Sequence, residues 1–150
     1  MRSLIMAVGL AACLGLAGCG GAEEEVAAPP PPRKSMARVA PMYAGQEQIL
    51  SVQSGSVTPS QAGGVVLKAS GMSAGPGWAD PAFLPRIYPA TPADGIYEVD
   101  VIATKPATAA GETPTAIEAE GAWNRYTDGR VKGVKFMTKT NELTVMLPPG

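Results

Sequence analysis

From about Gln46 to Gly150 the chain is a series of short runs in which apolar and polar residues alternate, with glycine and proline between the runs. An alternation of period two predicts strands that bury one face and expose the other. No stretch of useful length has the 3.6-residue period of an amphipathic helix. The pattern therefore predicts an all-β domain over residues 46–150.

About seven runs are expected to form strands, near residues 49–53, 65–69, 83–88, 96–104, 117–123, 134–138 and 143–147. Short strands at this spacing over about 100 residues predict an antiparallel immunoglobulin-like β-sandwich. A small β-barrel is the alternative. Pro85 interrupts its run, which indicates an edge strand or a bulge, because proline cannot donate to the ladder.

The clearest run is Ile96 to Thr104. Val99 and Val101 share one face, and Glu98 and Asp100 share the other. We expect the two valines in the core and the two acids in water.

The N-terminal segment ends in Leu16-Ala17-Gly18-Cys19, which looks like a bacterial lipobox. Arg2 precedes an uncharged apolar run that is shorter than the roughly 20 residues that span a bilayer. The run ends in small residues, as a cleaved signal does. We therefore expect a lipoprotein signal peptide at 1–18 and a lipid on Cys19. Gly20, rather than an aspartate, follows the cysteine, which favours the outer membrane under the sorting rule of Gram-negative bacteria.

Residues 19–45 are expected to form a disordered Pro-rich tether. Three glutamates precede the four consecutive prolines Pro29–Pro32, and large apolar side chains are few. Such a proline run favours polyproline II and acts as a semi-rigid spacer.

Cysteine and histidine usage narrows the chemistry. Cys13 lies in the expected signal and Cys19 is the expected lipidation site, so no pair remains for a disulfide. The chain has no histidine, which excludes Ser-His-Asp and Cys-His arrangements and removes the commonest zinc ligand. We expect no catalytic residues, no metal and no cofactor.

The charge balance argues against nucleic acid as a partner. Of the 12 basic residues only Arg2 lies in the expected signal, so 11 remain against 13 acids, a formal charge of −2. A weakly acidic chain has no bulk electrostatic attraction to nucleic acid.

Trp78, Trp123 and Tyr126 are the candidate partner-binding residues. Trp78 lies in the irregular segment Gly75–Pro81 and could stack on a sugar ring or anchor a protein partner. In the alternative interpretation Trp78 folds back to cap the sandwich and at least one tryptophan is core.

Two pairs of acids are two residues apart on expected strands, Glu98 with Asp100 and Glu118 with Glu120. If the strands paired, four carboxylates could bind a cation or act as general acid and base. The alternative interpretation is that these acids lie on the solvent-exposed face of a strand, where alternation places polar residues two apart. The basic residues from Arg125 to Lys139 could likewise contact lipid phosphates or guard strand edges against aggregation.

The stretch from Ala69 to Pro106 resembles a group of uncharacterised small exported bacterial proteins. The residues that carry the resemblance are Gly71, Gly77-Trp78, Leu84-Pro85, Tyr88, Pro92-Ala93-Asp94-Gly95-Ile96-Tyr97, Val99, Asp100 and Ala103. The resemblance implies a β domain and assigns no activity. This chain departs from the group in having a lipobox.

These observations predict an outer-membrane-anchored lipoprotein that displays a non-catalytic β-sandwich as a binding or envelope-assembly module. Its expected partners are membrane lipid through acylated Cys19 and an envelope protein or glycan, with no nucleic acid. One alternative is an envelope-glycan hydrolase that uses the paired carboxylates. Another is an enzyme inhibitor that acts through the loop Gly75–Pro81.

Overall fold

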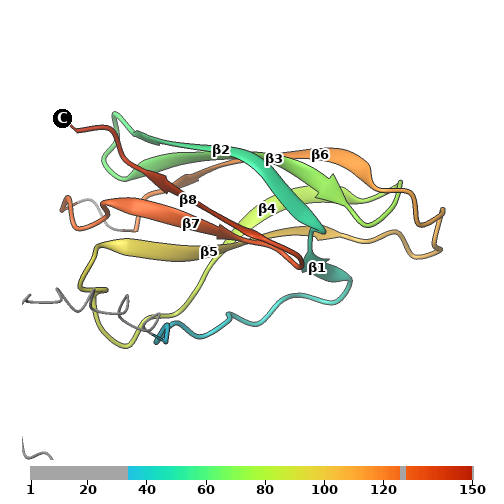
Figure 1. Ribbon diagram of the computed structural model, residues 1–150, viewed down its shortest axis with the longest axis horizontal. Coiled ribbons are helices and arrows are strands. Elements are labelled where there is room, and N and C mark those ends of the chain that lie inside the picture. Colours follow the sequence, from blue (N-terminus) through green and yellow to red (C-terminus); the bar gives the residue numbers. More distant parts are fainter. Residues whose placement is uncertain (1–33, 126–127, 150) are drawn as a thin grey trace, which may run out of the picture. The chain divides into compact units, whose positions relative to one another are not determined.

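The computed structural model describes residues 34–125 and 128–149, and all the regular structure in them is β-strand. The strands are β1 (Gln46–Gln48), β2 (Ser51–Pro59), β3 (Val65–Ser73), β4 (Ala79–Pro85), β5 (Ile96–Thr104), β6 (Thr115–Trp123), β7 (Gly133–Met137) and β8 (Glu142–Met146). They form one five-stranded and one three-stranded sheet. Figure 1 shows the two sheets as the layers of a sandwich.

β5 is the central strand of the five-stranded sheet. It pairs with β4 in antiparallel fashion along most of its length. On its other edge it pairs first with β7, in parallel, from Ile96 to Asp100, and then with β1, antiparallel, from Ile102 to Thr104. β8 completes the sheet by pairing with β7. β5 thus has neighbours on both edges, which explains why its residues are so deeply buried.

The three-stranded sheet has the antiparallel order β2-β3-β6. The chain passes to it directly from β1, and β2 carries a bulge between Val52 and Ser54. β4 lies beside β6, and β2 lies beside β8, so the edges of the two sheets approach each other on both sides. The inner faces of the two sheets bury the core between them.

Aromatic rings fill the core opposite small residues. Phe136 packs against Phe83 with ring centroids 5.5 Å apart. A Cβ on Gly55 would lie 2.7 Å from Phe136, and one on Gly121 would lie 3.3 Å from Phe83. The two glycines therefore make room for the two phenylalanines across the sandwich.

The predicted all-β sandwich is confirmed, with Val99 and Val101 in its core. The sheets are not wholly antiparallel, because β5 and β7 run in parallel. The expectation for Pro85 is met in part: it ends β4, and the irregular register of that strand lies earlier, between Ala79 and Ala82.

Residues 34–45, here called the strap, belong to the same compact unit as the sandwich, which begins at Lys34. Arg38 and Ile87 exchange two backbone hydrogen bonds, of 2.9 and 2.8 Å, and form a bridge. At the other end of the strap, the Lys105 N–H donates to the Gly45 carbonyl at 2.9 Å. The strap runs along the side of β5 that faces away from the three-stranded sheet (Figure 1). The expected tether of residues 19–45 is therefore too long at its C-terminal end, because residues 34–45 belong to the compact unit. Residues 19–33 lie outside the described residues.

Candidate functional site

Three connections meet with β1 at one end of the sandwich, here called the Trp78 end. They are residues 74–78 between β3 and β4, residues 105–114 between β5 and β6, and residues 138–141 between β7 and β8. The strand registers place them together, since Ser73 pairs with Thr115 and Thr104 pairs with both Ala79 and Gln46. The Trp78 end thus draws on both sheets.

The path of residues 74–78 is fixed by buried contacts. The Ser73 hydroxyl lies 2.8 Å from the Gly75 carbonyl and 3.0 Å from the Thr115 carbonyl, and donates to this pair of acceptors. Gly75 packs so closely on the next connection that a Cβ would lie 2.3 Å from the Gly111 carbonyl oxygen. The segment Gly75–Pro81 therefore packs against a neighbouring loop instead of standing clear of the sandwich.

Strained backbone follows directly after Trp78. Asp80 has φ of 50°, the sole positive φ among the described non-glycine residues. It lies in the irregular part of β4 between Ala79 and Ala82. Left-handed conformations of this kind cost free energy and concentrate at binding sites.

Trp78 is half-buried and packs against the hydrophobic core. Beside it is a hollow of about 180 Å³, lined mainly by small residues: Ala74, Gly75, Pro76, Pro106, Ala109, Ala110 and Gly111. The cavity is smaller than the roughly 300 Å³ of a pocket for a drug-sized molecule. It has room for one ring or one side chain of a larger ligand.

Two lysines and two glutamates supply the charge around the hollow: Lys105 and Glu112 line it, and Glu47 pairs with Lys105 and Lys139. Glu47 on β1 accepts from Lys105 Nζ at 2.5 Å and from Lys139 Nζ at 2.6 Å. These hydrogen bonds, first that from Lys105, lower the pKa of Glu47 from 4.5 to about 2. Lys139 Nζ also lies 5.9 Å from the centre of the Trp78 ring, within cation–π distance. One aromatic face and one apolar hollow therefore lie together with two lysines and their shared partner Glu47.

The structure separates the predicted partner-binding residues. Trp123 is only 9% exposed and packs edge-on against Tyr97, with ring centroids 5.5 Å apart. It pairs with Val65 at the start of β3, whereas Trp78 follows the end of β3. The two tryptophans do not form one patch, because Trp123 is a core residue at the opposite end, as the alternative interpretation has it. Tyr126 and Cys19 lie outside the described residues.

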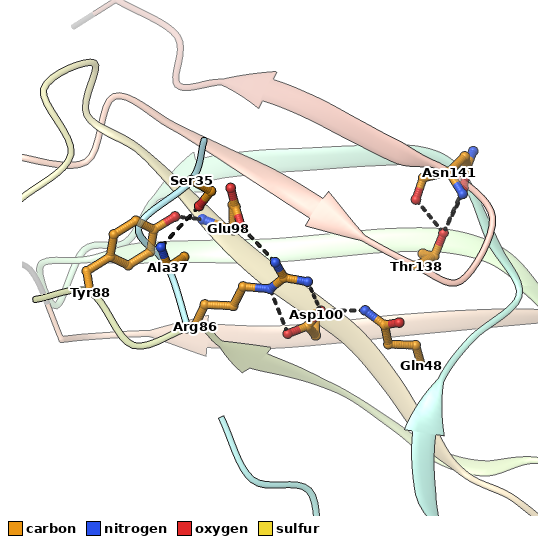
Figure 2. Close-up of polar contacts among 9 residues, drawn as sticks. All are labelled: Ser35, Ala37, Gln48, Arg86, Tyr88, Glu98, Asp100, Thr138 and Asn141. Carbon is orange, nitrogen blue, oxygen red and sulfur yellow. Dashed lines mark hydrogen bonds and ion pairs between the residues drawn. The ribbon is translucent and has the colours of Figure 1, made fainter. Parts of the chain in front are cut away.

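Glu98 and Asp100 do not face water, contrary to expectation (Figure 2). Asp100 is 0% exposed. Arg86 donates to both of its oxygens, from Nε at 3.0 Å and from Nη2 at 2.9 Å, and Gln48 donates at 2.5 Å. Arg86 Nη1 also lies 2.9 Å from Glu98. The acids alternate with core residues, as predicted, but flanking strands and the Arg86 and Gln48 side chains cover the outer face.

Both carboxylate oxygens of Asp100 accept hydrogen bonds in this acid cluster. The Tyr88 hydroxyl accepts from the Glu98 N–H at 2.9 Å, and the hydroxyl groups of Tyr88 and Ser35 hydrogen bond. The hydrogen bond with Asp100 is the main cause that raises the pKa of Arg86, so this arginine stays charged. Burial raises the pKa of Tyr88. A closed set of ionic partners of this kind holds structure together and leaves no carboxylate oxygen of Asp100 for a substrate.

Glu118 and Glu120 lie on the outer face of the other sheet and are exposed. Glu120 pairs with Lys68 at 3.1 Å across β3 and β6. With serines of β2 and β3 they line a shallow hollow of about 510 Å³. The four acids therefore lie in two separate places. Within the described residues, no three Asp, Glu, His or Cys side chains are grouped so that they could hold a metal ion.

Sequence reasoning missed Lys105, Lys139 and Glu47 at the Trp78 end, and Arg86 in the acid cluster. Only the strand pairings bring the first three together, and no local spacing indicates them. Arg86 had a visible signal: it is the one charged residue in the run Phe83 to Tyr88 and faces two acids of an apolar strand.

Comparison of the chain with protein families, with curated proteins and with solved structures finds no match. Residues 34–125 and 128–149 contain no helix long and apolar enough to cross a membrane.

Proposed function

We propose that this chain is a lipid-anchored envelope protein, attached to the outer membrane through Cys19, whose sandwich is a non-catalytic binding module. The lipobox Leu16-Ala17-Gly18-Cys19 supports the anchor. The meeting of Trp78, an apolar hollow and two lysines supports ligand binding at the Trp78 end.

The chemistry of the Trp78 end favours a ligand with a ring and a negative group, such as an acidic sugar of an envelope glycan. A sugar ring presents apolar C–H groups that stack on an aromatic face. A carboxylate on that ring would share Lys105 and Lys139, the donors at this end, with Glu47. The hollow of about 180 Å³ suits one such ring at the end of a longer chain.

The alternative of a glycan hydrolase has less support. Its four candidate acids lie on the outer faces of different sheets, and Asp100 is fully buried under Arg86 and Gln48. A loop-based inhibitor also has less support, because Gly75 is packed against Gly111.

The anchor is tested by replacing the two cysteines one at a time. Cys19→Ala should leave an unprocessed precursor, visible by intact-mass analysis, because the thioether has no acceptor. Cys13→Ala is the matched control and should be cleaved, lipidated and extracted with membranes like the parent. Cleavage after Gly18 in the Cys19→Ala variant would contradict the anchor.

The binding site is tested by photo-crosslinking in intact envelopes. A photoreactive residue at Ala110, which lines the hollow, should capture a glycan adduct that Trp78→Ala abolishes. The control is the same residue at Ala122, which is exposed on β6 away from the Trp78 end. Equal capture at the two positions, or capture unaffected by Trp78→Ala, would contradict binding at the Trp78 end.

A further inference from the structure

The strap concentrates the exposed apolar surface of the described residues. Their most exposed large apolar side chains are Met36, Val39, Tyr43, Ile87 and Met146. All but Met146 lie on the strap or, as Ile87 does, pair with it. Apolar side chains gathered in this way, rather than scattered singly, indicate an interaction surface.

Three of the five basic residues from Arg125 to Lys139, Arg130 among them, are paired with acids, and Arg125 and Lys132 form no ion pair with a described acid. Lys135 pairs with Glu142 and Lys139 pairs with Glu47. Lys34 and Arg38 are exposed and form no salt bridge with any acid among the described residues. With respect to the described residues, the strap therefore presents uncompensated positive charge beside apolar side chains, the combination found in segments that lie on anionic membranes.

The position of the strap in the chain identifies what it meets. Lys34 follows Cys19 by a stretch that reaches at most about 50 Å when fully extended. If Cys19 carries the lipid, no part of the sandwich is closer along the chain to the bilayer than the strap.

We infer that the strap docks on the surface of an anionic phospholipid bilayer, with Met36, Val39 and Ile87 at the interface and Lys34 and Arg38 on the head-group phosphates. This inference rests on the proposed lipid anchor, which already secures attachment. Docking adds orientation: it turns the strap side of β5 toward the membrane and the outer face of β2, β3 and β6 away from it.

The experiment exploits the absence of any other free thiol, since Cys13 leaves with the signal and Cys19 is acylated. Met36→Cys and Met146→Cys are labelled with an environment-sensitive fluorophore in the full lipidated protein. The two methionines have similar exposure: Met36 on the strap is 62% exposed and Met146 on β8 is 54% exposed. Position 146 is therefore the matched control for position 36. The labelled proteins are inserted into vesicles of phosphatidylcholine with and without phosphatidylglycerol.

The label at position 36 should shift its emission to the blue and be quenched by brominated acyl chains, and only in vesicles that contain phosphatidylglycerol. The label at position 146 should report water throughout. Lys34→Glu or Arg38→Glu should shift the docking equilibrium by at least about fivefold each, from roughly 1 kcal/mol per basic residue at such a surface. High salt should weaken docking in the same way.

If the emission of the label at position 36 reports water in the membrane-inserted protein, docking is overturned and the anchor is left intact. A blue shift that depends on protein concentration and not on vesicles would also overturn it, because a second copy would then cover the strap. Absence of the lipid by intact-mass analysis would overturn the anchor alone. Docking would then stand only if the unlipidated full chain still shows the shift when vesicles with phosphatidylglycerol are added.

Discussion

At the scale of single residues, Asp100 shows how burial changes the role of a side chain. Alternation along β5 correctly separates the core face, with Val99 and Val101, from the face that carries Glu98 and Asp100. Alternation cannot tell whether the second face meets water. Here Arg86 and Gln48 cover it, so Asp100 has become the centre of a buried ionic cluster.

Arg86→Met is expected to lower the free energy of unfolding by about 3–5 kcal/mol, because it leaves two buried carboxylates without their partner. The measurement is urea denaturation followed by circular dichroism. Lys68→Met is the control: it breaks the exposed pair with Glu120 and should cost less than about 1 kcal/mol. Asp100→Asn should cost about 1–3 kcal/mol through weakened charged hydrogen bonds. An effect of Asp100→Asn below about 0.5 kcal/mol, as at an exposed site, would contradict the buried cluster.

Glu47 predicts a stability change in acid. Its folded pKa of about 2 is below the ordinary value of 4.5, so the folded state binds fewer protons than the unfolded state. The stabilisation from Glu47 is therefore complete above about pH 4.5 and is lost as the pH falls toward 2. Because these side chains are partly exposed, its size is modest and decreases with salt.

The test compares thermal unfolding of the parent and of Glu47→Gln from about pH 6 to about pH 2, a range that includes both the folded and the ordinary pKa of Glu47. The difference in stability should be largest at the high end and shrink below about pH 4.5. A constant difference over the whole range would refute the ionic role of Glu47.

At the scale of elements, one side chain joins the edges of the two sheets. Asn141, in the β7–β8 turn, accepts from the Val52 N–H at 2.9 Å and donates to the Val52 carbonyl at 2.8 Å. Thr138 holds the same amide through its hydroxyl at 2.7 Å. Val52 stands at the bulge of β2, where the ladder with β3 is irregular. The Asn141 amide thus takes the place of a strand neighbour for the bulged backbone.

Asn141→Asp is expected to lower stability by about 1–3 kcal/mol, because an oxygen replaces the donor that faces the Val52 carbonyl. Amide hydrogen exchange should show faster exchange at Val52 and in β8, with little change in β3. The nearby Thr140→Val is a useful control, since it removes one exposed hydrogen bond to the Leu50 carbonyl. Equal effects of the two variants would argue against a special role for Asn141.

Local patterns predict strands better than they predict the partners of those strands. The alternation of Ile96–Thr104 and the turn residues before it mark β5, and its core face follows. The parallel pairing with β7 has no local signature, because it depends on which strands the sandwich brings together. For the same reason Trp78 could be identified from its irregular segment, whereas Lys105, Lys139 and Glu47 could not be assigned to it. For Trp123 the sequence left a core position and a surface position open, because core and surface tryptophans look alike in a sequence.

At the scale of the whole molecule, the compact unit is larger than the alternating pattern predicts. Residues 34–45 lack an alternating apolar pattern, yet they pair with Ile87 and hold Tyr88 against the Glu98 backbone. Polar contacts of the backbone and of the Ser35 hydroxyl, rather than buried apolar side chains, bind the strap to the sandwich.

Two fragments test this boundary. Residues 34–150 should unfold cooperatively on heating, with a β-type circular dichroism spectrum. Residues 46–150 should also fold but melt at a lower temperature, because Ile87 and Tyr88 lose the backbone and hydroxyl contacts that the strap supplies. Identical melting temperatures would show that the strap contributes nothing to the fold, and a helical spectrum for either fragment would contradict the sandwich.

The parallel pairing of β5 with β7 also sets when the molecule is able to fold. β5 ends at Thr104, its partner starts at Gly133, and the whole of β6 lies between them and joins the other sheet. Closing the loop between Thr104 and Gly133 costs conformational entropy before the stabilising core contacts form. Folding on the order of milliseconds to seconds is therefore expected. In a chain that emerges N-terminus first, the five-stranded sheet stays incomplete until β7 and β8 have followed. The topology therefore delays completion of the sandwich until the C-terminal strands β7 and β8 are available.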